Sequence, residues 1–292
     1  MSQQLSGVLT ALVTPFSADG SVDHATLSKV VERSISAGVD GVVACGSTGE
    51  VGALTAAERE AVVSTVVTAA AGRVPVIAQT GATSTAEAIR LSKAAEAAGA
   101  DVLMLVTPYY EPMTLAETVA YLDAVADAVT SEVMLYNIPG ATGVNLDPDT
   151  VRGLAERHEN VRYIKDSSAN WEQALQLIHH HSDVIGTFIG WDPYLYSALV
   201  EGAAGVMAGT GNVVPDQIVN VVAEVKAGDL VGARESWNAL YPVIDALISL
   251  PFIPAVKAGL GLQGLEVGVP RAPMATLDAA ETERLKHVLA AL

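Results

Sequence analysis

A lysine stands at the end of an apolar segment in the middle of the chain, where its charge is costly to bury. The segment Val161–Ile164 is predicted to form a short β-strand, and Asp166–Ser168 is predicted to form the turn that follows Lys165. An amine shielded from water loses part of its preference for the charged form. Because a neutral amine is a nucleophile toward carbonyl carbon, Lys165 is the first candidate for covalent chemistry.

Two other interpretations of Lys165 stay open at this point. Its amine could form a structural ion pair with Asp166 or Asp192, because such pairs also place lysines in unusual surroundings. Lys257 is a rival nucleophile, since it too follows an apolar run, Ala246–Val256, although it belongs to a predicted helical tail. The other four of the six lysines lie in predicted helices among charged residues and alanines, which indicates exposed side chains.

The ends of other predicted strands carry groups that could hold an anion or move a proton. The glycine-rich stretch Cys45–Glu50 places backbone N–H groups beside the hydroxyls of Ser47 and Thr48, and together these could hold a carboxylate or a phosphate. Short glycine-rich loops are also common as plain connections. Tyr136 stands near another strand end, where its phenol could relay protons or simply donate to a backbone carbonyl.

A few further polar groups invite a functional interpretation. Asp192 and Asn212 follow predicted strands and could either contact substrate hydroxyls or cap turns. The run His179–His181 could suggest a metal site, but consecutive side chains point apart and a catalytic zinc requires three converging ligands. We therefore expect no metal at this run of histidines. Cys45 has no obvious histidine partner and is expected to be a small core residue.

The elements that must position these groups alternate along the chain. Eight short apolar runs, rich in β-branched residues, are mostly continuous, which is typical of parallel strands covered on both faces. We predict strands at Gly7–Val13, Gly41–Cys45, Pro75–Gln79, Asp101–Val106, Glu132–Asn137, Val161–Lys165, Val184–Ile189 and Gly205–Ala208.

Helical patterns lie between the predicted strands and follow the last one. Capping boxes, which satisfy free N–H groups at a helix start, are expected at three pairs: Thr55 with Glu58, Ser84 with Glu87, and Thr114 with Glu117. A glycine in the left-handed conformation is expected to end the helix before three of the strands, at Gly38, Gly99 and Gly202. The recurrence indicates a repeated strand–loop–helix unit.

Eight such units predict an α/β fold, a closed (β/α)8 TIM barrel, which commonly needs about 250 residues. An open doubly wound sheet is the alternative, but the dinucleotide fingerprint G-x-G-x-x-G is absent after the first strand. We expect the barrel over residues 1–225 and a C-terminal helical region, 226–292, packed on it. The proline-broken run Ala246–Val256 is expected to be the most buried part of that region.

Composition limits the partners and the compartment. Half of the 292 residues are hydrophobic, which is enough for a large core. The formal net charge of −17 disfavours nucleic acid and anionic membranes as partners but allows a small anionic substrate. The single cysteine permits no internal disulfide, and the N-terminal segment lacks the features of a signal peptide, so we expect a cytoplasmic protein.

The stretches GSTGE, TPYY, YNIPGATG, IKDSS and GWD occur in this order along nearly the whole chain. As a set they resemble the dihydrodipicolinate synthase/N-acetylneuraminate lyase family. The resemblance implies a (β/α)8 barrel with C-terminal helices, a homotetramer built as a dimer of dimers, and catalysis without a metal. It also implies a covalent Schiff base between a lysine and pyruvate or another 2-oxo acid, and hence no cofactor.

The resemblance assigns roles to individual residues. Lys165 matches the Schiff-base lysine and Tyr136 the tyrosine that shuttles protons. Ser47 and Thr48 match the residues that hold the carboxylate of the 2-oxo acid, and Tyr110 matches a tyrosine that reaches across a dimer interface toward the neighbour's proton relay. Three further positions are expected at the substrate: Gly190, Asp192 and Met207.

One position departs from the synthases of this family. They carry an arginine just before the TG pair, where it binds the carboxylate of aspartate semialdehyde, and this chain has Ala141 there. Such a charge-assisted hydrogen bond contributes about 1.5–3 kcal/mol. Ser47, in place of the usual threonine, also favours the lyases, although Pro193 replaces an acidic residue expected in sialic acid lyases.

We therefore expect a Schiff-base aldolase or lyase that joins or separates a 2-oxo acid and an aldehyde, with Ala141 in the aldehyde pocket. Condensation of pyruvate with aspartate semialdehyde is the alternative within the family. Two other classes of protein also remain open. One is a sugar-phosphate enzyme that binds phosphate at the glycine-rich loops, and the other is a non-catalytic barrel that binds 2-oxo acids.

Overall fold

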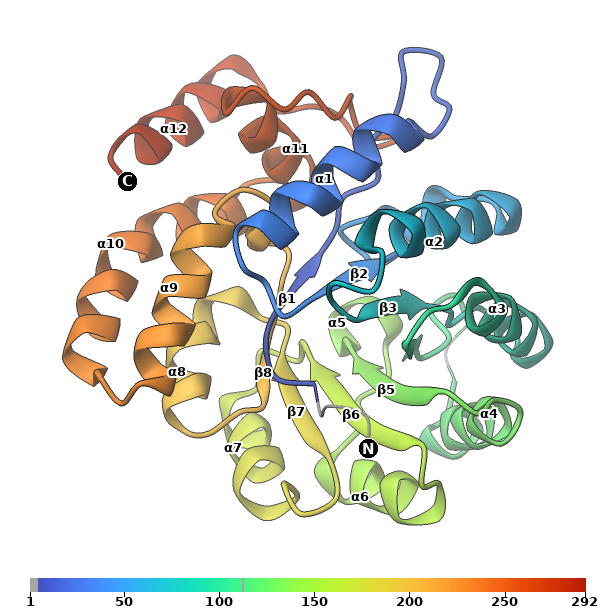
Figure 1. Ribbon diagram of the computed structural model, residues 1–292. Helices are drawn as coiled ribbons and strands as arrows, with labels where there is room; N and C mark the ends of the chain where they lie inside the picture. The colour runs from blue at the N-terminus through green and yellow to red at the C-terminus, as the bar shows by residue number, and fades with distance from the viewer. Residues whose placement is uncertain (1–4, 112) are drawn as a thin grey trace.

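The computed structural model describes residues 5–111 and 113–292, so the first four residues of the predicted 1–225 barrel lie outside the described part. Eight parallel strands close into a barrel in chain order, with β1 bonded to both β2 and β8 (Figure 1). The strands are β1 Gly7–Ala11, β2 Gly41–Ala44, β3 Val76–Gln79, β4 Val102–Val106, β5 Glu132–Asn137, β6 Val161–Asp166, β7 Gly186–Ile189 and β8 Gly205–Ala208. The predicted TIM barrel and its eight strands are confirmed.

The strands are buried on both faces, which is why their apolar runs are continuous. Side chains that point inward fill the barrel with one apolar cluster, which includes Leu9, Val43, Ile77, Met104, Met134, Tyr163, Phe188 and Met207. The Tyr163 and Phe188 rings meet edge to face, with centroids 6.0 Å apart. Because side chains alternate along a strand, an inward Tyr163 places Lys165 on the same inner side, one step nearer the strand's end.

Helices surround the strands (Figure 1). They are α1 His24–Ser36, α2 Ala56–Ala70, α3 Thr85–Ala98, α4 Leu115–Asp127, α5 Pro139–Thr142, α6 Pro148–Arg157, α7 Trp171–His180, α8 Leu195–Val200, α9 Pro215–Lys226, α10 Leu230–Ser249, α11 Phe252–Leu262 and α12 Ala279–Ala290. Short 3₁₀ turns follow three strands, at Val51–Ala53, Asp192–Tyr194 and Thr210–Asn212.

Helix starts and stops largely follow the predicted signals. The capping boxes at Thr55 and Thr114 are complete, whereas Ser84 accepts from the backbone of Glu87 without the return bond. The Glu87 carboxylate instead binds Arg90, 2.8 Å away, because a guanidinium three residues on offers a stronger, charged donor. The prediction of a complete capping box at Ser84 is therefore wrong, because the Glu87 side chain does not accept from the Ser84 backbone.

Glycines end the helices before β2, β4 and β8 as expected. Gly38, Gly99 and Gly202 have φ of 88°, 93° and 96°, values that residues with a Cβ rarely adopt. Each turn brings the chain directly into the next strand. The repeated unit seen in the sequence is thus a repeated backbone geometry.

The C-terminal region adds three helices beside the barrel, in orange to red in Figure 1. Helix α10 packs against α9 and α12, and α11 packs against α12. The break between Ser249 and Phe252 falls in the proline-containing run, and Pro254 to Val256 are buried. Within the described part of the chain, no helix is both long and apolar enough to cross a membrane.

Candidate active site

Lys165 lies near the carboxyl end of β6, beside Tyr136 on the neighbouring β5, with which it is in register. The amine lies 4.2 Å from the centre of the Tyr136 ring, and the two residues are only 5% and 2% exposed. Their closeness follows from strand pairing, because register partners on one face of a sheet stand side by side. The predicted pairing of lysine and phenol therefore exists in the fold.

Gly190, just after β7, makes room for the stem of this lysine. A Cβ at Gly190 would lie 2.5 Å from Lys165 Cε and 2.3 Å from Ser167 Oγ, distances that no packing tolerates. Glycine at 190 is therefore required for close packing around the lysine rather than for a turn, since its φ lies outside the left-handed region. Gly190, expected at the substrate, thus also packs against the side chain of Lys165.

The two carboxylates proposed as structural partners of Lys165 are engaged elsewhere. Asp166 accepts from Asn137 Nδ2 at 3.0 Å and from Ser168 Oγ at 2.9 Å. Asp192 accepts from the backbone and the hydroxyl of Thr210, at 2.9 and 2.6 Å. Within the described residues, no carboxylate lies close enough to the Lys165 amine to form an ion pair.

Burial governs both of these carboxyl groups. It raises the pKa of Asp166 and of Asp192 above the ordinary value, although the hydrogen bonds to each oppose the rise. The charge of Lys165 also favours the ionised form of Asp192, so the two groups interact through space without touching. Asp192 thus lies at the site as a second, buried ionisable group.

The loop after β2 brings two hydroxyls to the same place. Ser47 Oγ lies 3.3 Å from the Tyr136 hydroxyl, within hydrogen-bond distance. Thr48 is buried, and its hydroxyl would lie 2.9 Å from a Cβ at Gly209, so glycine there permits the loops after β2 and β8 to approach. Ser47, Thr48 and Tyr136 therefore form one polar corner beside the lysine.

These residues open onto a cavity of about 760 Å³ at the carboxyl ends of the strands, where barrel enzymes hold their chemistry. Every expected site residue except Tyr110 lines it: Ser47, Thr48, Tyr136, Ala141, Lys165, Gly190, Asp192 and Met207. Tyr110 follows β4, is 82% exposed and does not line the cavity of its own chain. Its expected role stays a prediction.

One wall of the cavity was not foreseen from the sequence. It is formed by the end of α10, the start of α11 and the segment before α12, through Ile248, Pro251, Phe252, Ile253, Pro254, Met274, Ala275 and Thr276. The proline-broken run was expected to be buried, and part of it instead faces this cavity. The prolines indicated a break in the helix, but not that the break would lie at the cavity.

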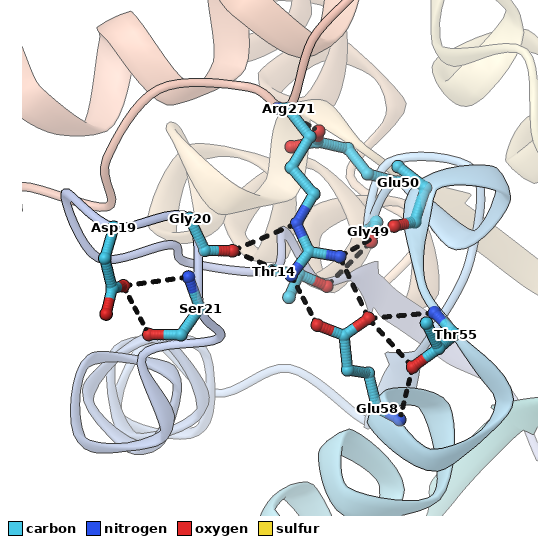
Figure 2. Close-up of polar contacts among 10 residues, drawn as sticks. Thr14, Asp19, Gly20, Ser21, Gly49, Glu50, Thr55, Glu58 and Arg271 are labelled. Carbon is cyan, nitrogen blue, oxygen red and sulfur yellow. Dashed lines mark hydrogen bonds and ion pairs between the residues drawn. The ribbon is translucent and has the colours of Figure 1, made fainter.

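The loop that carries Ser47 and Thr48 is attached to the same C-terminal segments through Glu50. Its carboxylate lies 2.5 Å from the Lys257 amine and accepts from the Arg271 backbone at 2.8 Å. Glu50 has a φ of 58°, a conformation that needs support in a residue other than glycine. The Arg271 guanidinium in turn binds Glu58 and the carbonyl of Gly20 (Figure 2).

The other candidate residues lie in surroundings that indicate structural roles. Asn212 accepts from Val13 N at 3.0 Å and donates to Ala11 O at 2.7 Å, so it joins two loops. Burial raises the pKa of the Cys45 thiol to about 12, which agrees with a core residue. His179 is exposed and contacts Glu201. The described residues hold no group of three or more His, Cys, Asp or Glu side chains that could share a metal ion.

Comparisons with known proteins agree with this geometry. A family model described as the dihydrodipicolinate synthetase family matches residues 4–292. A 4-hydroxy-tetrahydrodipicolinate synthase of Sorangium cellulosum is 40% identical over 291 residues, 99% of this chain and 97% of the relative. A relative of the same name from Geobacter metallireducens is 38% identical over 97% of both chains.

Solved structures are similar over their whole length. The dihydrodipicolinate synthase of Acinetobacter baumannii, solved with pyruvate, has a TM-score of 0.93 and 36% identity over 99% of both chains. YagE from Escherichia coli K12, a prophage protein also solved with pyruvate, has a TM-score of 0.93 and 32% identity, covering 98% of this chain and 97% of its own. Because the family model and the relatives match nearly the whole chain, this chain belongs to the dihydrodipicolinate synthetase family of enzymes.

Proposed function

We propose that this protein is a Schiff-base aldolase that uses pyruvate or a related 2-oxo acid and forms or cleaves a carbon–carbon bond with an aldehyde. The observation that carries the proposal is the buried amine of Lys165, which has no carboxylate partner among the described residues and stands against the Tyr136 ring. The amine faces the cavity at the ends of the strands, where in its unprotonated form it can attack the carbonyl carbon of a bound substrate.

The first step joins the amine to the keto carbon of the 2-oxo acid. Ser47, Thr48 and the neighbouring backbone N–H groups hold the substrate carboxylate, which places the keto carbon near Lys165. The amine adds to that carbon and its proton passes to the carbonyl oxygen, giving a carbinolamine. With one more proton the hydroxyl leaves as water, and a cationic iminium remains.

The second step makes or breaks the carbon–carbon bond. In the direction of synthesis, the iminium loses a proton from the adjacent carbon and becomes an enamine, which attacks the aldehyde while the aldehyde oxygen takes up a proton. Water then releases the product and restores the amine. Tyr136, within 3.3 Å of the Ser47 hydroxyl, is placed to carry these protons. Cleavage follows the same steps in reverse.

Trapping of the imine tests this proposal. Sodium borohydride added in the presence of pyruvate should reduce the iminium and leave a covalent adduct on Lys165, detected by peptide mass spectrometry. Lys257 provides an internal control, because it is also buried but paired with Glu50. An unmodified Lys165 in enzyme shown to bind pyruvate would overturn the proposal, and so would an adduct on Lys257.

A second candidate is 4-hydroxy-tetrahydrodipicolinate synthase, which would condense pyruvate with aspartate semialdehyde. The names of relatives that are 38% and 40% identical favour it. Ala141 speaks against it, because alanine offers no charged donor for the carboxylate of aspartate semialdehyde. Pyruvate consumption with aspartate semialdehyde, measured for the wild type and for Ala141→Arg, distinguishes the two. Efficient use by the wild type, unchanged in the variant, would favour the synthase.

The proposal extends to the assembly. We propose a cytoplasmic homotetramer, a dimer of dimers that needs no metal or cofactor, in which Tyr110 contacts the site of a neighbouring chain. The 82% exposure of this aromatic side chain supports the idea, since a tyrosine at an interface buries its ring and keeps its hydroxyl available. Sedimentation of the wild type and of Tyr110→Ala, with rates for each, tests it.

A further inference from the structure

The charges around the cavity limit which aldehyde it can accept. Lys165 and Asp192 are the only charged side chains among the described residues that line it. The amine of Lys165 is consumed in bonding to the 2-oxo acid, and both hydrogen bonds of Asp192 go to Thr210. A second substrate with a carboxylate would therefore enter beside a buried aspartate and find no cation reserved for it.

Arg271 does not replace the missing arginine. It lines an adjoining cavity of about 370 Å³ that shares Ser47, Ile138, Ala141, Ile253 and Met274 with the first. Its guanidinium is already held by Glu58 and donates to the carbonyls of Ala53 and Gly20, at 2.7 and 2.8 Å (Figure 2). A guanidinium with these partners is neutralised and cannot turn toward Ala141 without breaking them.

The cavity lining includes an apolar wall. Its large side chains are Ile138, Trp191, Phe252, Ile253 and Met274. Two hydroxyls nearby are occupied, because Ser167 donates to Gly190 O at 3.1 Å and Ser168 to Asp166 at 2.9 Å. An apolar surface with few free donors binds hydrocarbon better than a charged or heavily hydroxylated chain.

From this, and resting on the function proposed above, we infer that the aldehyde partner is uncharged and carries an apolar body, alkyl or aryl, that lies on the wall of Ile138, Trp191, Phe252, Ile253 and Met274. Ala141 and the first residues of α11 would then select the second substrate. The C-terminal region thereby has a role in specificity besides packing on the barrel.

A matched pair of aldehydes tests the inference. Succinic semialdehyde and its methyl ester have the same reacting end and differ by the charge at the other. With pyruvate held constant, we expect kcat/KM for the ester to exceed that for the acid by roughly 10-fold or more. This ratio corresponds to the cost of placing a carboxylate in the cavity without a charged donor. Benzaldehyde should be used better than glyceraldehyde, which is uncharged but hydroxylated.

Two substitutions identify the residues responsible. Ala141→Arg should shift the ratio toward the acid, whereas Ala141→Met, with a long unbranched side chain but no charge, should not. Phe252→Asn should reduce the advantage of benzaldehyde over glyceraldehyde. An equal or better rate with succinic semialdehyde in the wild type would overturn the inference, as would a ratio unaffected by Ala141→Arg.

Borohydride trapping with pyruvate alone separates the two proposals. If the adduct forms on Lys165 and the charged aldehyde is still preferred, the aldolase assignment stands and the inference on the aldehyde fails. If the adduct forms and no aldehyde is used, the wall does not hold an aldehyde and the inference also fails. If no adduct forms, the proposed function itself fails.

Discussion

Two lysines of this protein are almost completely buried, and they differ in whether a carboxylate lies beside the amine. Lys165 is 5% exposed and Lys257 is 4% exposed. Both lie 4.2 Å from the centre of an aromatic ring, Tyr136 for the first and Phe16 for the second. Burial and a ring face are therefore common to the two, and neither explains a difference in chemistry.

The difference lies in the neighbouring carboxylate and in the space beyond the amine. Lys257 faces Glu50 at 2.5 Å and donates to Val269 O at 3.3 Å, so two of its three donors are taken. Burial lowers its pKa, and the hydrogen bond to Glu50 opposes that change. Lys165 forms no ion pair within the described residues and opens onto a cavity. A buried lysine becomes a candidate nucleophile only when its charge is left uncompensated and a substrate can reach it.

The largest expected effect comes from removing the amine of Lys165. Lys165→Met should reduce aldol turnover by at least ~10³-fold, because no covalent intermediate can form. The free energy of unfolding should change by no more than about 1 kcal/mol, since the side chain leaves no partner unpaired. Steady-state rates and urea denaturation give the two values. Retained turnover, or a protein that fails to fold, would contradict the assignment of a chemical role to Lys165 and a structural role to Lys257.

The opposite pattern is expected for Lys257. Lys257→Met leaves the buried Glu50 without its counterion and should destabilise the fold by about 3–5 kcal/mol. Lys226→Met is the control, because its ion pair with Asp40, at 3.9 Å, is exposed and is expected to contribute ~0–1 kcal/mol. The double variant Glu50→Leu with Lys257→Met should recover much of the loss in urea denaturation. Equal effects at 257 and 226 would refute the buried pair as a stabilising contact.

The space around Lys165 gives a third test. Gly190→Ala places a methyl group against the lysine stem, so the amine must move and the rate of imine formation should fall by roughly 10–100-fold. Gly52→Ala is the control, since a Cβ there meets nothing within 4 Å. Stopped-flow trapping with pyruvate measures both. An unaffected rate in Gly190→Ala would show that the lysine does not depend on this close packing.

The smallest expected effect concerns the partly buried ion pair between Glu58 and Arg271, whose backbone also donates to Glu50 (Figure 2). The hydrogen bond from Arg271 lowers the pKa of Glu58 from 4.5 to about 2. A lowered pKa in the folded state means that the stabilisation is complete above about pH 4.5 and disappears as the pH falls toward 2. The difference in unfolding free energy between wild type and Glu58→Gln should follow that course, and a difference that grows on acidification would contradict it.

Much of the barrel could be predicted because its signals are local. A continuous run such as Val102–Val106 indicates a strand covered on both faces, and Gly99 before it needs a left-handed conformation that few other residues adopt. The Ser84 box failed for a local reason too, because Arg90 competes for Glu87. The capping-box pattern includes Ser84 and Glu87 but takes no account of Arg90.

The site was predictable in part. Lys165 and Tyr136 were expected from their places at strand ends, and strand register then brings them together. The wall that contains Phe252 and Met274 was missed, since its position depends on how α10 and α11 pack. The same holds for Glu50 and Lys257, which lie far apart in the chain and meet only in the folded protein.

The sequence by itself determined which segments become strands and helices and which side chains bring an amine, a phenol and hydroxyls to the strand ends. These follow from periodicity, turn chemistry and alternation, which act over a few residues. Only the tertiary structure decided that Lys257 is neutralised while Lys165 is not, and that the C-terminal helices close the cavity with apolar side chains. Charge compensation and cavity shape depend on groups that come together from distant parts of the chain. A local sequence pattern does not specify which distant residue will lie beside a given side chain.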